Sequence, residues 1–522
     1  MKNYKIITLL LIISILFNII RSNKISLKDS DSGSNGNQDI QILINDILNN
    51  CSSSESSSCF GTQWGVVADI YTPSNGEFTN IFSLNELQAF TPASNTKLFT
   101  TISIFYTFGE DFKVFTPFFT DKPFNSVSGG SSNSELDFIC VKGMGDPSMS
   151  IDNLIEAAKF FSSNPTMKKV NKLLLDTSFY NIGNGVDGNI PSAWEWEDLT
   201  STYGSIPTPL IINENTMDIY ITPSNVIGGK PTASFKYSGE DKYLPVIILA
   251  TTTTTSNSST STLNYSFKMS SQSIYITGNC DINGGIQIIT VPILDPEQYF
   301  LTVFSALLED GGVEISQTAI GSCNYTGMDY KSFEVISPEL SEMLNYTLLT
   351  SNNLYAETFL RQMGTFNSAA SESTPTYQAG LEYIQQTLSI PTSLYTQVDG
   401  SGLSRNNFIT PKSLITVIEN VYTNVGDPQH DYISYLPVAS LSGTLSKRFI
   451  NTPASGIVHA KTGSMTGVNS LTGVILPNGL SDDQQNSIFF SIIANNSPAQ
   501  NTDIIDIIDQ IVILLTKFIL SS

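Results

Sequence analysis

The sequence is poor in positive charge and in metal-binding side chains. Its 522 residues include Lys+Arg 25 against Asp+Glu 47, which gives a net charge of −22. Nucleic acids and anionic membrane surfaces attract basic proteins, so this acidic excess argues against both as partners. Five Cys and two His, with no C-x-x-C pair, do not make a zinc framework. We therefore expect no metal and no other cofactor, and the oligomeric state stays open.

Long apolar runs are missing after the N-terminus. Lys2 and Lys5 precede an apolar run from Ile6 to Ile20, which suits a secretory signal peptide and is short for a membrane span. We predict a signal peptide over residues 1–21, with membrane attachment only if it stays uncleaved. Six N-x-[ST] sequons fit a eukaryotic secretory route and predict a glycoprotein that is secreted or held in a lysosomal or phagosomal lumen: Asn50, Asn257, Asn264, Asn324, Asn345 and Asn495.

The few cysteines agree with such a compartment. Cys51 and Cys59 bracket a short serine run, and they either close it as a disulfide or remain two exposed thiols. Cys140, Cys280 and Cys323 are expected to be small buried hydrophobic residues, with one pair allowed among them. The odd count leaves at least one thiol free.

Changes in composition divide the chain into segments. Residues 22–58 are rich in Ser, Asn and Asp and are predicted to be a linker with a short helix. Residues 59–115 and 331–522 have the texture of one α/β unit. Between them, residues 116–330 alternate short β-like runs with turns and predict one or two inserted β-rich domains. The Ser/Thr tract Thr251–Thr262 is expected to be a surface loop.

Hydrophobic periodicity predicts the main elements outside the insertion. Thr91 is a plausible N-cap for a helix with Pro92 at its first position. We expect strands at Trp64–Tyr71, Glu77–Ser83, Ile457–Lys461, Val468–Ile475 and Ile488–Ala494, and helices at Thr91–Phe105, Pro338–Met363 and Ile504–Leu520.

Three short motifs carry the chemistry of the chain. They are Ser94-Asn95-Thr96-Lys97, Ser351-Asn352-Asn353 and Lys461-Thr462-Gly463. Each is weak alone, because serine is abundant and a solvated helix face is the default interpretation of Ser94 and Lys97. However, Ser94 is the only serine with a lysine three residues later, and the only K-T-G begins where a predicted strand ends. In this order the motifs are those of serine penicillin-recognising enzymes.

The first motif can supply an activated nucleophile. Helix positions i and i+3 are neighbours, so Lys97 can reach the Ser94 hydroxyl and remove its proton. The lysine can act as a base only if burial and a second cation, for which Lys461 is the candidate, lower its pKa toward neutrality. The net charge of −22 opposes this, so the cleft must be closed and poorly hydrated.

The other motifs suit substrate binding and proton transfer. Ser351 can pass a proton to a leaving amine, and the Asn353 amide can hold both a peptide backbone and the lysine. The backbone N–H groups of Ser94 and Ser464 are the predicted oxyanion donors. Lys461 offers a positive charge for a terminal carboxylate.

The K-T-G motif contributes two further substrate contacts. Thr462 adds a hydroxyl for the same carboxylate as Lys461. Gly463 is expected to leave room for a substrate lying along the strand.

The sequence resembles the class C low-molecular-mass penicillin-binding proteins, which are D-alanyl-D-alanine carboxypeptidases and endopeptidases. The likeness runs from about Trp64 to the C-terminus. Beyond the three motifs it includes the Leu354–Gly364 continuation, the loop Asp399-Gly400-Ser401-Gly402-Leu403-Ser404-Arg405, and Ser470-Leu471-Thr472-Gly473. The insertion is similar at Gly143–Pro147 and Asp176–Phe179, and Ser440 stands where the family usually has glycine.

The resemblance implies a transpeptidase-like α/β (α+β) domain, an antiparallel sheet flanked by helices and split by inserted β-rich domains. It also implies an acyl-enzyme route. Ser94 attacks the peptide carbonyl, D-alanine leaves, and water releases the acyl group. Peptidoglycan stem peptides and β-lactams are the implied partners. Asp187 lies near where some members bind a substrate side-chain amine.

Three alternatives stay open from the residues. A Ser-His-Asp hydrolase is disfavoured because the chain has no G-x-S-x-G motif and only two histidines, His430 and His459. We interpret His459 as structural. A catalytically silent receptor for muropeptides or penicillin would bind without turnover, and a β-lactamase-like esterase would release penicillin quickly.

Overall fold

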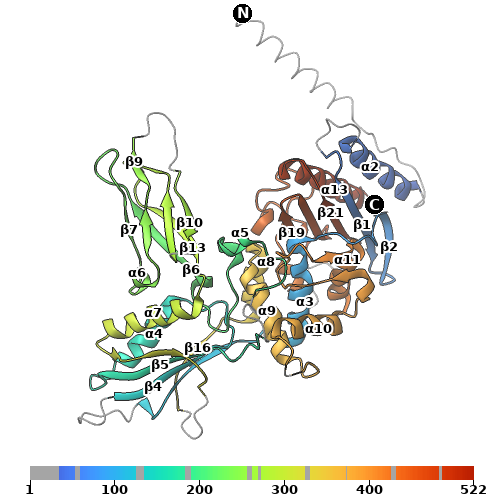
Figure 1. The fold of residues 1–522 in the computed structure, drawn as a ribbon. Helices are drawn as coiled ribbons and strands as arrows, with labels where there is room; N and C mark the ends of the chain where they lie inside the picture. Colours follow the sequence, from blue (N-terminus) through green and yellow to red (C-terminus); the bar gives the residue numbers. More distant parts are fainter. Residues whose placement is uncertain are drawn as a thin grey trace, which may run out of the picture.

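The computed structural model describes residues 35–521, apart from residues 53–58, 125–134, 183–189, 255–261, 269–271, 324–329, 372, 425–430 and 481–484. The predicted signal peptide, Asp187 and His430 lie outside the described residues. Two lobes are visible, one built from both ends of the chain and one from its middle (Figure 1).

A five-stranded antiparallel sheet forms the centre of the first lobe, as the resemblance implies. Its strands lie in the order β19-β20-β21-β1-β2. Every residue of β20 and β21 is buried, which is typical of strands with both faces covered. The strands are β1 (Gln63–Thr72), β2 (Glu77–Leu84), β19 (Val458–Met465), β20 (Val468–Ile475) and β21 (Ser487–Asn495). The five predicted strands are therefore confirmed.

Helices cover both faces of this sheet and create two separate cores. On one face α2 (Asn35–Ser52) and α13 (Asn501–Ser521) bury aliphatic side chains. A larger group packs on the other face: α3 (Lys97–Phe108), α8 (Leu340–Thr350), α9 (Asn353–Phe366), α10 (Thr376–Leu388), α11 (Pro411–Asn424) and α12 (Asp431–Ser434). Among the described residues, none of the helices combines the length and apolar character needed to cross a bilayer.

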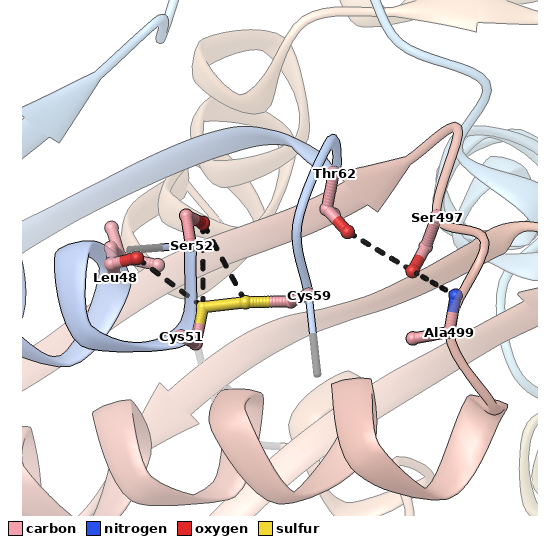
Figure 2. Close-up of a disulfide and its surroundings, with 7 residues drawn as sticks. All are labelled: Leu48, Cys51, Ser52, Cys59, Thr62, Ser497 and Ala499. Carbon is pink, nitrogen blue, oxygen red and sulfur yellow. Dashed lines mark hydrogen bonds between the residues drawn. A yellow bond between two sulfur atoms is a disulfide. The ribbon is translucent and has the colours of Figure 1, made fainter. Parts of the chain in front are cut away.

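The predicted linker contains a packed helix. Ile40, Ile44 and Leu48 of α2 are buried against the sheet, so the helix is longer than expected and belongs to the packed lobe. Of the two alternatives for Cys51 and Cys59, the structure shows the disulfide, which joins the end of α2 to the chain entering β1 (Figure 2).

The helix that carries the first motif begins later than predicted. Thr91 is not its N-cap, because its backbone N–H donates to Asn495 Oδ1 at 2.8 Å and its carbonyl accepts from the same amide. Residues Ala93–Thr96 instead form a 3-10 turn, and α3 starts at Lys97. The contact with Asn495, at the end of β21, holds this segment against the sheet.

The helical stretch predicted over Pro338–Met363 is divided in two. Ser351 ends α8 in the left-handed region with φ 60°, and the Asn352 side chain caps α9 by accepting from Tyr355 N at 3.0 Å. The break places Ser351, which is half-buried, at a corner between two helices, and a continuous helix would have no such corner.

The middle of the chain forms the second lobe from several sheets. The largest has the order β14-β5-β4-β3-β16, with β15 also paired to β5, and α4 and α7 pack on it. Its elements are β3 (Phe115–Thr120), β4 (Glu135–Lys142), α4 (Ile151–Ser162), β5 (Lys169–Asp176), α7 (Pro296–Asp310), β14 (Glu314–Ile315), β15 (Thr318–Ile320) and β16 (Tyr330–Ile336). Two helices therefore accompany the predicted β-rich texture.

Smaller sheets extend this lobe. They comprise β6 (Thr216–Thr222), β7 (Thr232–Ser234), β8 (Val246–Ile248), β9 (Thr251–Thr253), β10 (Asn264–Lys268), β11 (Ser273–Thr277), β12 (Asn279–Asp281) and β13 (Gln287–Pro292), with short helices α5 (Trp196–Leu199) and α6 (Glu240–Tyr243). The start of the Ser/Thr tract, expected to be a loop, is strand β9. A β17–β18 pair (Tyr395–Thr396 with Phe408–Ile409) belongs to the first lobe.

The remaining cysteines divide as the odd count requires. Cys140 in β4 is bonded to Cys323, which follows β15, and both lie in the second lobe. Cys280 in β12 is a buried free thiol.

Candidate active site

The three sequence motifs meet at one place. Ser94 lies in the 3-10 turn and Lys97 is the first residue of α3, which follows the turn without a break. The two side chains therefore lie on the same side, with Lys97 Nζ 2.9 Å from Ser94 Oγ. Lys461 Nζ, at the middle of β19, lies 2.8 Å from Ser351 Oγ at the corner between α8 and α9. The predicted convergence of segments far apart in the sequence is confirmed.

The surroundings of Lys97 orient its amine toward the serine. Its Nζ also lies 2.6 Å from Asn353 Oδ1 and 2.7 Å from the Ser401 carbonyl oxygen. The Asn353 amide is fixed this way round because its Nδ2 donates to the Tyr203 carbonyl at 2.8 Å. Both oxygens only accept, so a neutral amine places its two hydrogens on them. Its lone pair then faces the Ser94 hydroxyl.

Burial gives this amine the basicity that the chemistry needs. Lys97 is completely buried, and this desolvation lowers its pKa to about 7. The carboxylates of Asp399 and Glu357 act in the opposite direction, but burial outweighs them. A substantial fraction of Lys97 is therefore a free amine near neutral pH, as a general base requires.

The second lysine is also buried. Burial lowers the pKa of Lys461 well below its ordinary value, and the charge of Lys97 lowers it further. Its amine donates to Ser351 Oγ and to the Thr462 carbonyl, each at 2.8 Å. The positive charge of Lys97 thus disfavours protonation of Lys461.

Thr462 and Gly463, the other residues of the K-T-G motif, follow Lys461 on β19. The Thr462 hydroxyl donates to Thr444 Oγ1 at 2.8 Å, and Ser464, whose side chain is exposed, pairs with Asn469 of β20. A Cβ on Gly463 would lie 2.5 Å from the Pro92 carbonyl oxygen and 3.1 Å from Ser94 N. The glycine is therefore needed for the close approach of β19 to the segment that carries Ser94, a reason that the sequence did not reveal.

A buried ion pair on α9 contacts the loop that holds Lys97, and the sequence did not reveal it. Glu357 and Arg361, four residues apart on α9, are joined at 3.0 Å and are almost fully buried. Glu357 Oε1 accepts the backbone N–H groups of Gly400 and Ser401 at 2.9 Å each. The pair therefore holds the two peptide units that precede the Ser401 carbonyl, which itself contacts Lys97. Opposite charges at i and i+4 within an apolar helix were the available signal.

The Asp399–Arg405 loop is organised by its first residue. Asp399 is buried and accepts the backbone N–H groups of Gly402 and Ser404, at 2.8 and 2.6 Å. It also accepts from Asn407 Nδ2 at 2.8 Å and from the Trp194 indole at 3.0 Å. Trp194 belongs to the second lobe, so the two lobes share this loop.

His459 lies on β19 and forms a hydrogen bond with the backbone of Ile433. Its ring is buried, which lowers its pKa to about 4, so it is neutral at physiological pH. Its Nδ1 has no partner among the described residues. This agrees with the interpretation of His459 as structural.

Comparison with known proteins places the chain in a family. The model of the D-Ala-D-Ala carboxypeptidase 3 (S13) family matches residues 57–518. The chain belongs to this S13 family. It is a serine-type D-Ala-D-Ala carboxypeptidase, similar to penicillin-binding protein 4, and the resemblance seen in the sequence is confirmed.

Two curated relatives match the S13 chain over most of their length. A D-alanyl-D-alanine carboxypeptidase from an Actinomadura species is 25% identical over 451 residues, covering 83% of this chain and 78% of its own. The D-alanyl-D-alanine carboxypeptidase DacB of Haemophilus influenzae is 22% identical over 397 residues, covering 73% and 76%.

Solved structures agree in fold. Penicillin binding protein 4 from Haemophilus influenzae superposes with a TM-score of 0.69 at 20% identity, covering 88% of this chain and 94% of that chain. A structure of the same protein in complex with a β-lactam gives a TM-score of 0.66 at 18% identity, covering 91% and 98%. The penicillin-binding transpeptidase-like fold with inserted β-rich sheets is thereby confirmed.

Proposed function

We propose that Ser94 is the nucleophile of this carboxypeptidase and that Lys97 is its general base. The Ser94 oxygen attacks the carbonyl carbon of a D-Ala-D-Ala peptide while its proton moves to the Lys97 amine. The backbone N–H groups of Ser94 and Ser464 would stabilise the oxyanion. The 2.9 Å approach of the buried Lys97 amine to Ser94 Oγ carries this proposal.

The second half of the reaction needs a proton for the leaving group. In our proposal Ser351 delivers it to the D-alanine nitrogen as the carbon–nitrogen bond breaks, and Lys461 replenishes the hydroxyl. The proton that Lys97 took from Ser94 passes to Lys461, so both lysines return to their starting protonation states. Water then attacks the acyl-serine carbonyl and Lys97 takes a proton from it. That proton goes to the Ser94 oxygen as the acyl–oxygen bond breaks, which releases the acid and regenerates Ser94. The contact of 2.8 Å between Lys461 Nζ and Ser351 Oγ supports this relay.

Substrate binding is assigned to the remaining motif residues. Lys461 and Thr462 would bind the terminal carboxylate, whose negative charge raises the pKa of Lys461 and restores its proton. Asn353 would hold the peptide backbone beside Lys97, and Gly463 would keep β19 close to Ser94. Peptidoglycan stem peptides ending in D-Ala-D-Ala are the proposed substrates, cleaved as a carboxypeptidase or an endopeptidase.

The deciding experiment locates a penicillin adduct and measures turnover. Benzylpenicillin should add its mass to the peptide containing Ser94, and Ser94→Ala should remain unlabelled. The wild-type protein should also release D-alanine from a D-Ala-D-Ala peptide. Labelling without D-alanine release would favour the silent receptor, and rapid loss of the adduct would favour a β-lactamase-like esterase. An adduct at another residue would contradict the assignment of Ser94.

We also propose that the protein works in an oxidising lumen or outside the cell, where it trims bacterial peptidoglycan. Two disulfides, Cys51–Cys59 and Cys140–Cys323, support this, because such bonds persist in secretory compartments. Loss of effect on purified peptidoglycan in Ser94→Ala, compared with the wild-type protein, would support the substrate assignment. No effect of the wild-type protein would count against it.

Glycosylation tests the secretory assignment. Asn50, Asn264 and Asn345 are exposed, whereas Asn495 is 7% exposed and bonded to Thr91. We expect glycans at the first three and none at Asn495 when the protein is secreted from eukaryotic cells. Peptide masses before and after enzymatic deglycosylation measure this. A glycan on Asn495 would contradict the described packing of β21.

A further inference from the structure

A strained turn in the second lobe lies against the corner that carries Ser351. Asn213, Glu214 and Asn215 have φ of 49°, 56° and 51° in succession. Asparagine tolerates this left-handed region, but glutamate does not favour it. Such a conformation persists where the surroundings fix it, and it is enriched at functional sites.

The second lobe itself holds this turn in place. Asn213 donates its backbone N–H to the Met149 carbonyl and accepts from Ile151 N through its side chain, each at 3.0 Å. Asn215 is fully buried and donates through its side chain to the Ile206 carbonyl at 2.8 Å. The two flanking asparagines therefore fix the backbone, and Glu214 between them is the residue presented outward.

The Glu214 carboxylate contacts both sides of the α8–α9 corner. One oxygen accepts from the Tyr346 hydroxyl on α8, and the other accepts from Asn352 Nδ2 at 2.7 Å. Asn352 is next to Ser351, and its own side-chain oxygen caps α9 at Tyr355 N. Each carboxylate oxygen thus fixes one of the two helices between which Ser351 lies.

We propose that Glu214 is a positioning residue for Ser351 in the carboxypeptidase reaction. It acts through Asn352 and Tyr346 and touches no reacting atom. Ser351 has a left-handed backbone, with φ 60°. By fixing the corner, Glu214 holds the Ser351 hydroxyl within reach of Lys461 Nζ. The inference rests on the proposed role of Ser351 as the donor to the leaving amine.

The test compares Glu214→Gln in two backgrounds. Glutamine has the same shape but carries one neutral oxygen and an NH2 group, so the contact with Asn352 loses its charge and the Tyr346 hydroxyl can only accept. With a D-Ala-D-Ala peptide we expect kcat to fall roughly tenfold and KM to change little, because a misplaced proton donor slows chemistry rather than binding. In a Ser351→Ala background the same substitution should lower kcat by less than about twofold, since the group that Glu214 positions is already gone.

Additional variants separate positioning from folding. Glu214→Gly adopts the left-handed conformation readily, so the turn is retained while both contacts are lost, and kcat should fall at least as much as for Glu214→Gln. Tyr346→Phe removes one contact and should give a smaller loss that also vanishes with Ser351→Ala. Glu156→Gln, at an exposed position on α4, is the matched control and should have no effect.

The outcomes discriminate between the two levels of the proposal. The positioning role is overturned if Glu214→Gln lowers kcat equally in the wild-type and Ser351→Ala backgrounds. It is also overturned if Glu214→Gln leaves kcat unchanged in the wild-type background. In either case Ser351 keeps its assignment. If Ser351→Ala itself leaves kcat unchanged, the proposed function of Ser351 is wrong and the inference falls with it.

Discussion

Replacing Lys97 by methionine should slow penicillin acylation of Ser94 by about 10³-fold, within the range that removal of a general base produces. Methionine fills the buried site without an amine, so Asn353 Oδ1 and the Ser401 carbonyl lose a donor and the Ser94 hydroxyl loses its base. The rate of appearance of the adduct by mass spectrometry measures the effect. Ser94→Ala gives the unlabelled baseline.

The wild-type pH profile is the internal control for that result. Protonated Lys97 cannot accept a proton, so the acylation rate should fall about tenfold per pH unit below the Lys97 pKa of about 7 and level off above it. This fall in rate at low pH, the acid limb of the profile, should be absent in Lys97→Met. A variant that acylates at the wild-type rate, or that keeps the limb, would show that another group is the base.

Replacing Arg361 by methionine should lower the free energy of unfolding by about 3–5 kcal/mol, because removal of one partner leaves the other charge buried alone. Burial and the Asp399 carboxylate already raise the pKa of Glu357, and Arg361 opposes them. Without Arg361, Glu357 tends to take up a proton and its bonds to Gly400 and Ser401 weaken. Denaturant unfolding gives the stability.

A matched double variant tests the cause of that loss. Glu357→Gln with Arg361→Met removes both charges, so it should be more stable than Arg361→Met alone. Acylation should be slow in both, because neither variant keeps a charged carboxylate on the N–H groups of Gly400 and Ser401, which precede the carbonyl that contacts Lys97. If Arg361→Met costs less than about 1 kcal/mol, the pair is not what supports this loop.

The sequence predicted the elements whose periodicity is local. Val468–Ile475 is a strand with the predicted bounds, since an unbroken apolar run flanked by turn residues suits a strand buried on both faces. The predicted start of α3 was wrong because Thr91 is hydrogen-bonded to Asn495. Local helix propensity cannot predict a contact with a residue so distant in the sequence.

The site divides in the same way. Ser94, Lys97, Ser351, Asn353 and Lys461 were predicted to converge, because motifs mark them. The turn at Ser351 was missed, since serine rarely adopts a left-handed conformation and only the three-dimensional packing enforces it. Glu357 and Arg361 were missed because an i, i+4 charge pair is usually a solvated helix feature. Their burial depends on tertiary packing.

The pairing of β1 with β21 has a consequence for biosynthesis. Residues 63–71 of β1 align with residues 487–495 of β21, so a ribosome must finish nearly the whole polypeptide before the central sheet can close. Until then the β1–β2 hairpin exposes an unpaired, apolar edge, which is a hazard for aggregation and slows folding.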